Sequence, residues 1–218
     1  MLTLRKRACV AGCMLVAILS LIYGCTTTSS GIDLAVRGGL TMEISQTGTA
    51  TAKVTARVVN TLGGPNMILT SDQGLTVNAS GLTVGPFTGE YTANLTAADA
   101  YVITFRDQGE TASLTVLQQT DLDEIGVSGG AEELTVTWAP SGEAEVSVAV
   151  SIDGRTKLTT SDSGLLTLGP DDLEDLDSGL HTVTVRRFRT VTVSPAFDGL
   201  LDRAEVSVGT QSEVEVAF

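Results

Sequence analysis

Apolar and polar residues alternate along most of the chain after residue 32. The first half has three such runs, at 52–58, 91–95 and 101–105. Strict alternation predicts half-buried β-strands, because successive side chains of a strand point to opposite faces. Clusters of Gly, Pro, Asn and Asp separate the runs, and no segment shows convincing helical periodicity. The pattern therefore predicts an all-β fold.

The second half repeats this style. Alternation returns at 134–138, 146–150 and 181–185, and shorter runs follow at 191–193, 206–208 and 214–218. The dipeptide Asp153-Gly154, which follows Ile152, is a hairpin signal. Many short strands joined by turns are typical of an antiparallel β-sandwich.

A weak internal repeat suggests how these strands are grouped. The hexapeptide TSDQGL at 70–75 is echoed by TSDSGL at 160–165, an offset of 90 residues. This spacing is close to the roughly 100 residues of one sandwich module. We therefore expect two modules, at 32–118 and 131–218, with an acidic, glycine-containing linker at 119–130. A single larger sandwich remains the alternative.

Two segments add a resemblance. The sequence SGLHTVTVR at 178–186 resembles a late strand of bacterial immunoglobulin-like and fibronectin type III-like modules. The sequence GEYTANLT at 89–96, followed by YVITF at 101–105, is similar to related envelope modules. The resemblance implies two tandem immunoglobulin-like β-sandwiches that mediate protein contact or act as a spacer.

The N-terminal segment has the form of a targeting signal. Arg5, Lys6 and Arg7 precede an apolar run at 8–22, about 15 residues long. A helix needs roughly 20 residues to span a bilayer, so a cleaved signal peptide at 1–24 is the better interpretation. An uncleaved signal anchor is the alternative.

The end of this segment, Leu21-Ile22-Tyr23-Gly24-Cys25, resembles the lipobox of bacterial lipoproteins. Tyr23 departs from the small or β-branched residue usual at its position. The resemblance implies cleavage before Cys25, diacylglycerol on its thiol and a polar tether at 25–31. Thr26 stands where Asp would retain an enterobacterial lipoprotein at the inner membrane. The implied location is the bacterial cell envelope, at the outer membrane.

Charge and cysteine placement exclude several classes of function. The formal charge is −13, and without residues 1–24 ten basic side chains would face 26 acidic ones, for −16. Such a surface repels nucleic acid, which we exclude as a partner. All three cysteines lie in the first 25 residues. We therefore expect neither disulfides nor a thiolate metal site in the folded part.

The residue inventory gives no support for an enzyme. His181 is the single histidine, and it shares strand parity with Val183 and Val185. This placement indicates a structural histidine bonded to backbone, because no second partner for a catalytic triad or a zinc site is evident. No acidic residue lies in a sequence pattern that would place it in an apolar pocket. Aromatic residues, which commonly line sugar-binding sites, make up 4 % of the chain. We expect no catalytic residues.

Two charged clusters could bind ligands. In the acidic run, the spacing of Leu173 and Leu176 favours one helical turn with its acids facing water. A calcium site is the alternative, because hard cations bind several carboxylate oxygens. Its candidate ligands are Asp171, Asp172, Glu174, Asp175 and Asp177.

The basic cluster comprises Arg186, Arg187 and Arg189. Nearby carboxylate partners would explain it, and an acidic ligand or a glycan phosphate is the alternative.

The sequence thus predicts a non-enzymatic envelope lipoprotein, bound to the membrane by its lipid, with a protein or glycan partner. A glycan- or calcium-dependent binding module at the cell surface is the second hypothesis.

Overall fold

The computed structural model describes residues 38–60, 65–85, 88–119, 121–122 and 124–217. The predicted signal peptide, Cys25 and the tether lie outside the described residues. The contacts of the chain group residues 34–218 into one unit.

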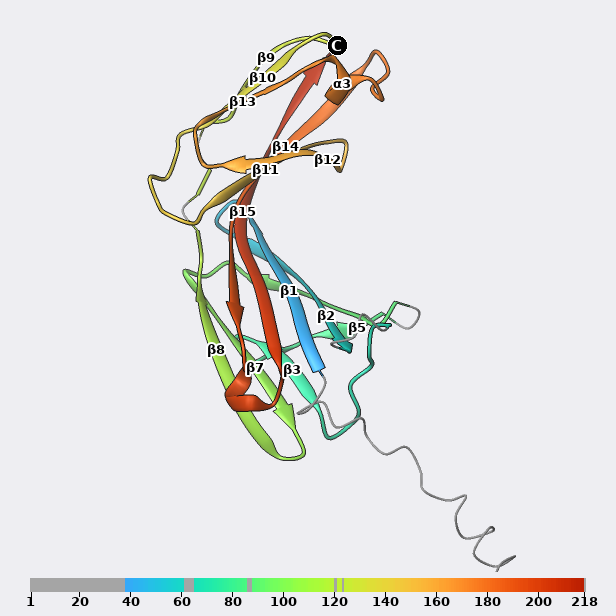
Figure 1. Cartoon of the computed structure of the whole chain (residues 1–218), viewed down its shortest axis with the longest axis vertical. Coiled ribbons are helices and arrows are strands. Elements are labelled where there is room, and N and C mark those ends of the chain that lie inside the picture. Colours follow the sequence, from blue (N-terminus) through green and yellow to red (C-terminus); the bar gives the residue numbers. More distant parts are fainter. Residues whose placement is uncertain (1–37, 61–64, 86–87, 120, 123, 218) are drawn as a thin grey trace, which may run out of the picture. The chain divides into compact units, whose positions relative to one another are not determined.

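The described residues are mostly strands (Figure 1). In chain order the elements are β1 (Gly38–Thr47), β2 (Thr51–Asn60), β3 (Gly74–Val77), β4 (Ser80–Gly81), β5 (Thr83–Val84), β6 (Glu90–Thr96), β7 (Ala100–Asp107), β8 (Glu110–Leu117), β9 (Gly126–Gly129), β10 (Leu134–Thr137), β11 (Ser147–Ile152), β12 (Arg155–Ser161), β13 (Leu165–Leu168), α3 (Pro170–Leu173), β14 (Leu180–Val193), the 3₁₀ turn η1 (Phe197–Gly199) and β15 (Arg203–Ala217). The predicted all-β class is confirmed.

The strands form three sheets. The largest has the order β12-β11-β14-β15-β1-β2-β6-β5, and the others have the orders β4-β3-β7-β8 and β13-β10-β9. The pairs of described strands are antiparallel, except that β1 runs parallel to β15. The sheets thus match the predicted antiparallel architecture apart from one parallel pair.

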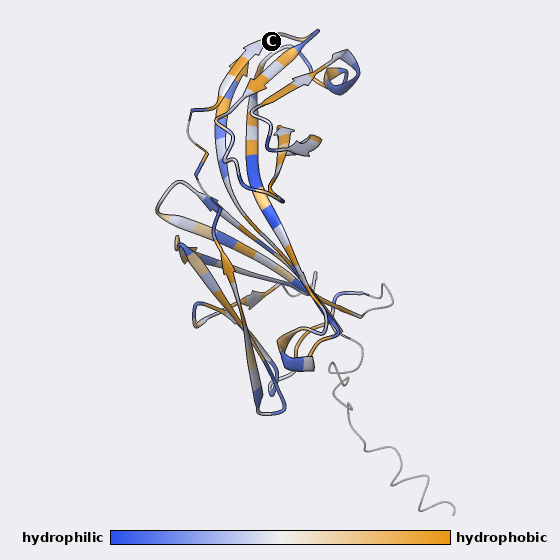
Figure 2. Ribbon diagram, turned by 60° about the vertical axis from the view of Figure 1, so that its left-hand side comes forward, coloured by the Kyte–Doolittle hydropathy of each residue, from blue (hydrophilic) through white to orange (hydrophobic). Residues whose placement is uncertain are grey.

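A first hydrophobic cluster lies between the four-stranded sheet and one part of the large sheet. On β2 its members are Ala52, Val54, Ala56 and Val58, the apolar parity seen in the sequence. Tyr101, Ile103 and Phe105 face them from β7 and are fully buried. Apolar residues therefore recur at every second position of these strands, as the banded colouring of Figure 2 shows.

A second cluster lies between the three-stranded sheet and the other part of the large sheet. It joins Leu134, Val136 and Trp138 to the apolar face of β11 and to Val183 and Val185 of β14. The predicted hairpin at Asp153-Gly154 is present, because it connects β11 to β12. Both clusters have the two-layer arrangement of a β-sandwich.

The strands β14 and β15 belong to both clusters. The sequence predicts short separate strands at 181–185, 191–193, 206–208 and 214–218, but these runs merge into two long strands in continuous register. Val183 and Val185 lie in the second cluster, whereas Val191 and Val193 pack against the first. Because these four residues share one parity, the same face of β14 serves both clusters.

Because β14 and β15 are shared by both clusters, they bear on the predicted division into two modules. Residues 196–208, which the sequence places in the second module, contribute Ala196, Phe197, Leu201 and Val206 to the first cluster. Strand β9 also lies inside the predicted linker, since it pairs with β10. The division at 119–130 stays a prediction, and the described contacts join its two sides through one sheet.

The helical turn α3 follows Gly169 and begins at Pro170, a favourable first position because proline has no N–H to leave unpaired. Leu173 is buried in the second cluster and Leu176 packs against it. The predicted helical turn is thus confirmed.

Among the described residues, no helix is long and apolar enough to cross a membrane.

Gly209 provides a test of the shared strands. It pairs with Phe188 on one side and with Ser45 on the other. A Cβ at this position would overlap the carbonyl oxygen of Arg187 and approach the Cβ of Phe188 to 2.8 Å. We expect Gly209→Ala to lower the free energy of unfolding by about 2–3 kcal/mol in urea titrations, because the strands must separate locally. Gly179→Ala is the control, since a Cβ there meets nothing within 4 Å. Equal stability of the two variants would contradict this packing.

Candidate functional site

Arg187 lies inside the second sandwich. It follows the parity of Val183 and Val185 on β14, and its side chain is 2 % exposed. Its Nε lies 3.1 Å from Oδ2 of Asp162, whose side chain is 4 % exposed. The two form a buried ion pair.

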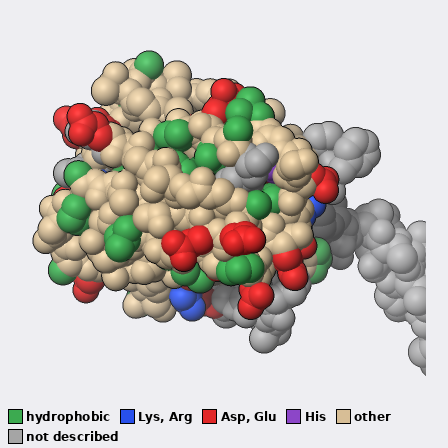
Figure 3. All heavy atoms as spheres, turned by 90° about the horizontal axis from the view of Figure 1, so that it is seen from above, with side chains coloured by type: hydrophobic (Ala, Val, Ile, Leu, Met, Phe, Trp, Pro, Cys, Tyr) green, Lys and Arg blue, Asp and Glu red, His purple; other side chains and the backbone are tan. Residues whose placement is uncertain are grey.

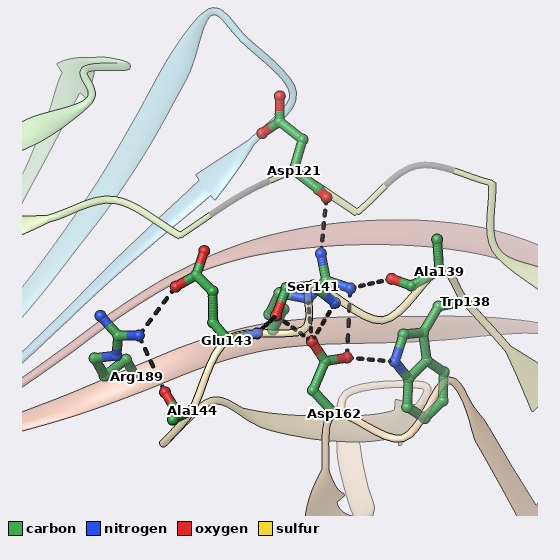
Figure 4. A network of polar contacts seen from close by, with 9 residues as sticks. Asp121, Trp138, Ala139, Ser141, Glu143, Ala144, Asp162 and Arg189 are labelled. Carbon is green, nitrogen blue, oxygen red and sulfur yellow. Dashed lines mark hydrogen bonds and ion pairs between the residues drawn. The ribbon is translucent and has the colours of Figure 1, made fainter.

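Asp162 is the centre of a hydrogen-bond network drawn in Figure 4. It comes directly after β12 and accepts bonds from Trp138 Nε1 at 2.7 Å, from the Ser141 amide at 2.8 Å and from the Ser141 hydroxyl at 2.6 Å. Burial by itself would raise the pKa of Asp162, but these bonds and the charge of Arg187 outweigh it and lower the pKa. The carboxylate is thus held in its ionised form.

The guanidinium of Arg187 also binds the backbone. Nη1 donates to the carbonyl oxygen of Asp121 at 2.9 Å, and Nη2 donates to that of Ala139. Within the described part of the chain, Arg187 therefore ties β14 to the segment after β8, the segment after β10 and the residue after β12. A planar guanidinium with five N–H donors suits this role.

The other two arginines have carboxylate partners as well. Nη2 of Arg186 lies 3.4 Å from Glu43 of β1, and its guanidinium carbon lies 4.8 Å from the centre of the Phe188 ring. Burial lowers the pKa of Arg186, and Glu43 opposes that shift. Nη2 of Arg189 donates to Glu143 at 2.9 Å and to the Ala144 carbonyl at 3.1 Å.

All three candidate arginines therefore have the carboxylate partners that the simpler sequence interpretation expects. An anionic ligand would have to displace Glu43, Asp162 or Glu143 to reach them. Such displacement is unfavourable for Arg187, because its side chain is buried and removing Asp162 would leave its charge without compensation.

The acidic candidates are not brought together. Asp171 and Asp172 lie in α3, where an Asp172 carboxylate oxygen accepts a bond from the Gly169 amide at 3.1 Å. Asp175 lies 3.9 Å from Arg155 in an exposed ion pair. Within the described residues, no group of three or more His, Cys, Asp or Glu side chains could hold a metal ion. The geometry thus gives no support to calcium at Asp171, Asp172, Glu174, Asp175 and Asp177.

His181 has acceptors on both sides of its ring. Nδ1 lies 2.7 Å from Oδ2 of Asp153, and Nε2 lies 2.8 Å from the carbonyl oxygen of Asp177. Asp153 also accepts a bond from the Thr182 amide at 2.9 Å. Two acceptors favour the doubly protonated imidazolium, so the bond to Asp153 raises the pKa of His181, and the same bond lowers that of Asp153. These contacts agree with the interpretation of His181 as a structural residue bonded to backbone.

A pocket with a volume of about 340 Å³ lies at one end of the first sandwich. Three turns build it: the β1–β2 turn, the β6–β7 turn and the segment after β8. Its lining residues are Gln46, Thr49, Ala97, Ala98, Asp99, Gln118, Gln119 and Asp121. No sequence pattern pointed to this pocket, because its polar residues come from the end of β1 and from three separate connecting segments and carry no spacing motif.

The polar groups of this pocket are unusual in their hydrogen bonding. Gln119 is 3 % exposed, yet its Oε1 has no partner among the described residues. Both amide atoms of the half-buried Gln118 side chain likewise lack described partners. Gln46 is buried and accepts a bond from the hydroxyl of Tyr101 at 3.0 Å. Buried polar atoms without partners are rare in native structures.

No protein-family model matches the chain, and no curated protein does. Among solved structures, a cytokine receptor complex is similar over 81 % of this chain and 95 % of that chain, at 13 % identity and a TM-score of 0.30. A structure of Sidekick-1 immunoglobulin domains 1–4 is similar over 78 % of this chain, at 11 % identity and a TM-score of 0.18. This chain spans 48 % of that second structure. Such low TM-scores establish no relationship with either protein.

The buried pair gives a testable stability effect. We expect Asp162→Ala to lower the free energy of unfolding by about 3–5 kcal/mol, because it leaves the Arg187 charge buried without its partner. Asp162→Asn should be destabilising too, since it keeps the shape but removes the charge. Glu205→Gln is the control: its ion pair with Arg203 is exposed, and its loss should cost less than about 1 kcal/mol. Urea unfolding measures all three variants, and similar losses for Asp162→Ala and Glu205→Gln would disprove the assignment.

The histidine gives a testable pH effect. With its pKa raised in the folded state, His181 stabilises the protein fully below its ordinary pKa of about 6.5. This contribution declines as pH rises above 6.5 and is lost once pH passes the raised, folded-state pKa. Unfolding free energies of wild type and His181→Gln, measured from pH 5.5 to 9, should therefore converge as pH rises. Because the chain has one histidine, its ring-proton NMR titration reports the folded pKa directly. A midpoint at or below 6.5 would refute the expectation.

Proposed function

We propose that this chain is a non-enzymatic lipoprotein of the bacterial cell envelope, anchored through Cys25, whose β-sandwich part mediates protein contact or acts as a spacer. The proposal that the protein is not an enzyme rests on the contacts that its ionisable side chains make. Among the described residues, His181, Asp162 and the three arginines of β14 all bind other parts of the fold. None of them is left poised for a substrate.

The anchor rests on the lipobox resemblance and on the polar tether after it. Two or three acyl chains contain tens of methylene groups, each worth about 0.8 kcal/mol when buried in lipid, so such an anchor is permanent. The acidic surface would keep the folded part away from anionic headgroups. On the face drawn in Figure 3, acidic side chains predominate over basic ones.

The spacer and contact roles rest on the sheet. Its two hydrophobic clusters are joined by the hydrogen-bonded strands β14 and β15 as well as by the segment 118–125. This shared ladder keeps the two clusters connected by paired strands and not by a single linker, which suits a spacer. The exposed strand β8, with Leu117 on its surface, forms an edge at which another protein could pair.

Metabolic labelling with an alkyne fatty acid tests the anchor. We expect the wild-type protein to carry the label and Cys25→Ser to lose it completely, because Cys25 would be the acylated residue. Cys13→Ser is the matched control, since it removes a cysteine from the apolar run and leaves the lipobox intact. Label retained by Cys25→Ser, or lost equally by both variants, would overturn the proposal.

Protease treatment of intact cells then gives the orientation. Loss of the folded domain without lysis indicates the outer surface and favours a contact role with other cells or matrix. Digestion only after the envelope is opened indicates an inward-facing protein and favours partners in the envelope.

A further inference from the structure

Strand β8 is an edge of the four-stranded sheet over its whole length. Within the described residues it pairs with β7 alone, from Glu110 to Leu117, without a register shift. No described strand lies along its other side. An edge of this kind can pair with a strand of another protein molecule through its backbone N–H and C=O groups.

The hydrogen bonds of β7 show which residues of β8 direct their backbone groups to the free edge. The N–H and the C=O of Val102 on β7 both bind Asn78, on the side away from β8. Directly opposite residues of an antiparallel pair exchange either both of their backbone bonds or neither. Thr115, which lies opposite Val102, therefore directs its N–H and C=O outward. Because the pattern alternates, the same holds for the other odd-numbered residues of β8.

Strand β8 also lacks the features that usually prevent edge pairing. Residues 111–117 include no charged residue and no proline. By contrast, the edge strand β12 carries Arg155 and has a register shift against β11. The part of β15 beyond its pairing with β1 carries Glu213 and Glu215, and β9 and β13 have four residues each. Charges, irregular pairing and short length all discourage edge pairing, so β8 is the unprotected edge among these strands.

Two leucines of β8 are incompletely covered by the fold. Leu114 has the parity of the buried Ala112 and Val116, yet it is only partly buried against the first cluster. Leu117, on the opposite face of the strand, is 65 % exposed. A further strand beside β8 would remove apolar surface of both leucines from water, which favours association.

We infer that the partner at this edge is a second copy of this chain, whose β8 pairs antiparallel with the first across a two-fold axis at Leu114. This inference names a partner for the contact role proposed above and rests on it. The register places Thr111 opposite Leu117. It likewise places Ser113 opposite Thr115, so that residues with outward backbone groups pair with one another. Leu114 then faces its counterpart in a pair without hydrogen bonds, where opposite side chains are closest.

Charge and symmetry favour a copy as the partner. The chain carries a formal charge of −13, so two copies repel each other where acids would face acids. In the proposed register Glu110, the one charged residue of β8, lies opposite the neutral Gln118. A two-fold interface must be complementary to itself, and β8 meets this condition in its backbone groups and its charge.

Sedimentation equilibrium of the full-length chain in density-matched detergent tests for the dimer. We expect wild type to form a concentration-dependent dimer and Thr115→Lys to associate at least tenfold more weakly. A lysine on an edge strand discourages pairing, and the two introduced charges would lie in adjacent pairs across the interface. Thr92→Lys is the matched control, because Thr92 is an exposed threonine with a strand on each side. It should associate as wild type does.

Hydrogen exchange of wild type then locates the interface. The odd-numbered amides of β8 should exchange more slowly at high than at low protein concentration, whereas the even-numbered amides, which already bind β7, should change little. This measurement needs no variant, so it holds if Thr115→Lys does not fold.

Three results would overturn the inference: a wild type that stays monomeric, a dimer without this protection of β8, or equal weakening by Thr115→Lys and Thr92→Lys. A monomeric wild type that captures a different protein, when Thr115→Lys does not, would assign the edge to that protein instead of a copy. None of these results bears on the lipid anchor, because fatty-acid labelling of Cys25→Ser tests the anchor separately.

Discussion

The backbone ladder between β14 and β15 is the constraint on which the rest of the structure depends. It runs without a register shift from the pair Leu180–Ala217 to the pair Val193–Ala204. One end of the ladder packs its side chains into the first hydrophobic cluster, and the other end packs into the second. A shift by one residue would turn every side chain of one strand to the opposite face, so an error in the ladder would disturb both cores together.

The buried pair of Arg187 and Asp162 fixes the position of this ladder. A charge placed inside a sandwich is tolerated only when its partners are arranged around it, and here Trp138, Ser141 and two backbone carbonyls complete the set. The segments that carry these partners must therefore meet β14 at one point. Removing one partner of such a pair is strongly destabilising, because the other charge is then left buried without compensation.

The polar groups of this fold are of two kinds. Those of the second sandwich, around His181 and Arg187, bind one another and explain why the charged clusters of the sequence form no open site. The buried glutamines of the first sandwich, Gln118 and Gln119, leave side-chain atoms without described partners. The charged groups around His181 and Arg187 are therefore paired within the fold, whereas the glutamine amides are buried without described partners.

The sequence by itself determined the strands and their inward faces, as at 52–58, 134–136 and 181–185. It also determined the inward position of His181 and the turn that buries Leu173. The alternation of apolar and polar residues is a local feature. It predicts the faces of a strand even when the strand's neighbours are unknown. Only the tertiary structure decided that β14 and β15 serve both clusters, that Arg187 meets Asp162, and that Gln46, Gln118 and Gln119 share a pocket. These features depend on which strands and turns lie together, and a period of two specifies the face of a strand but not its neighbour.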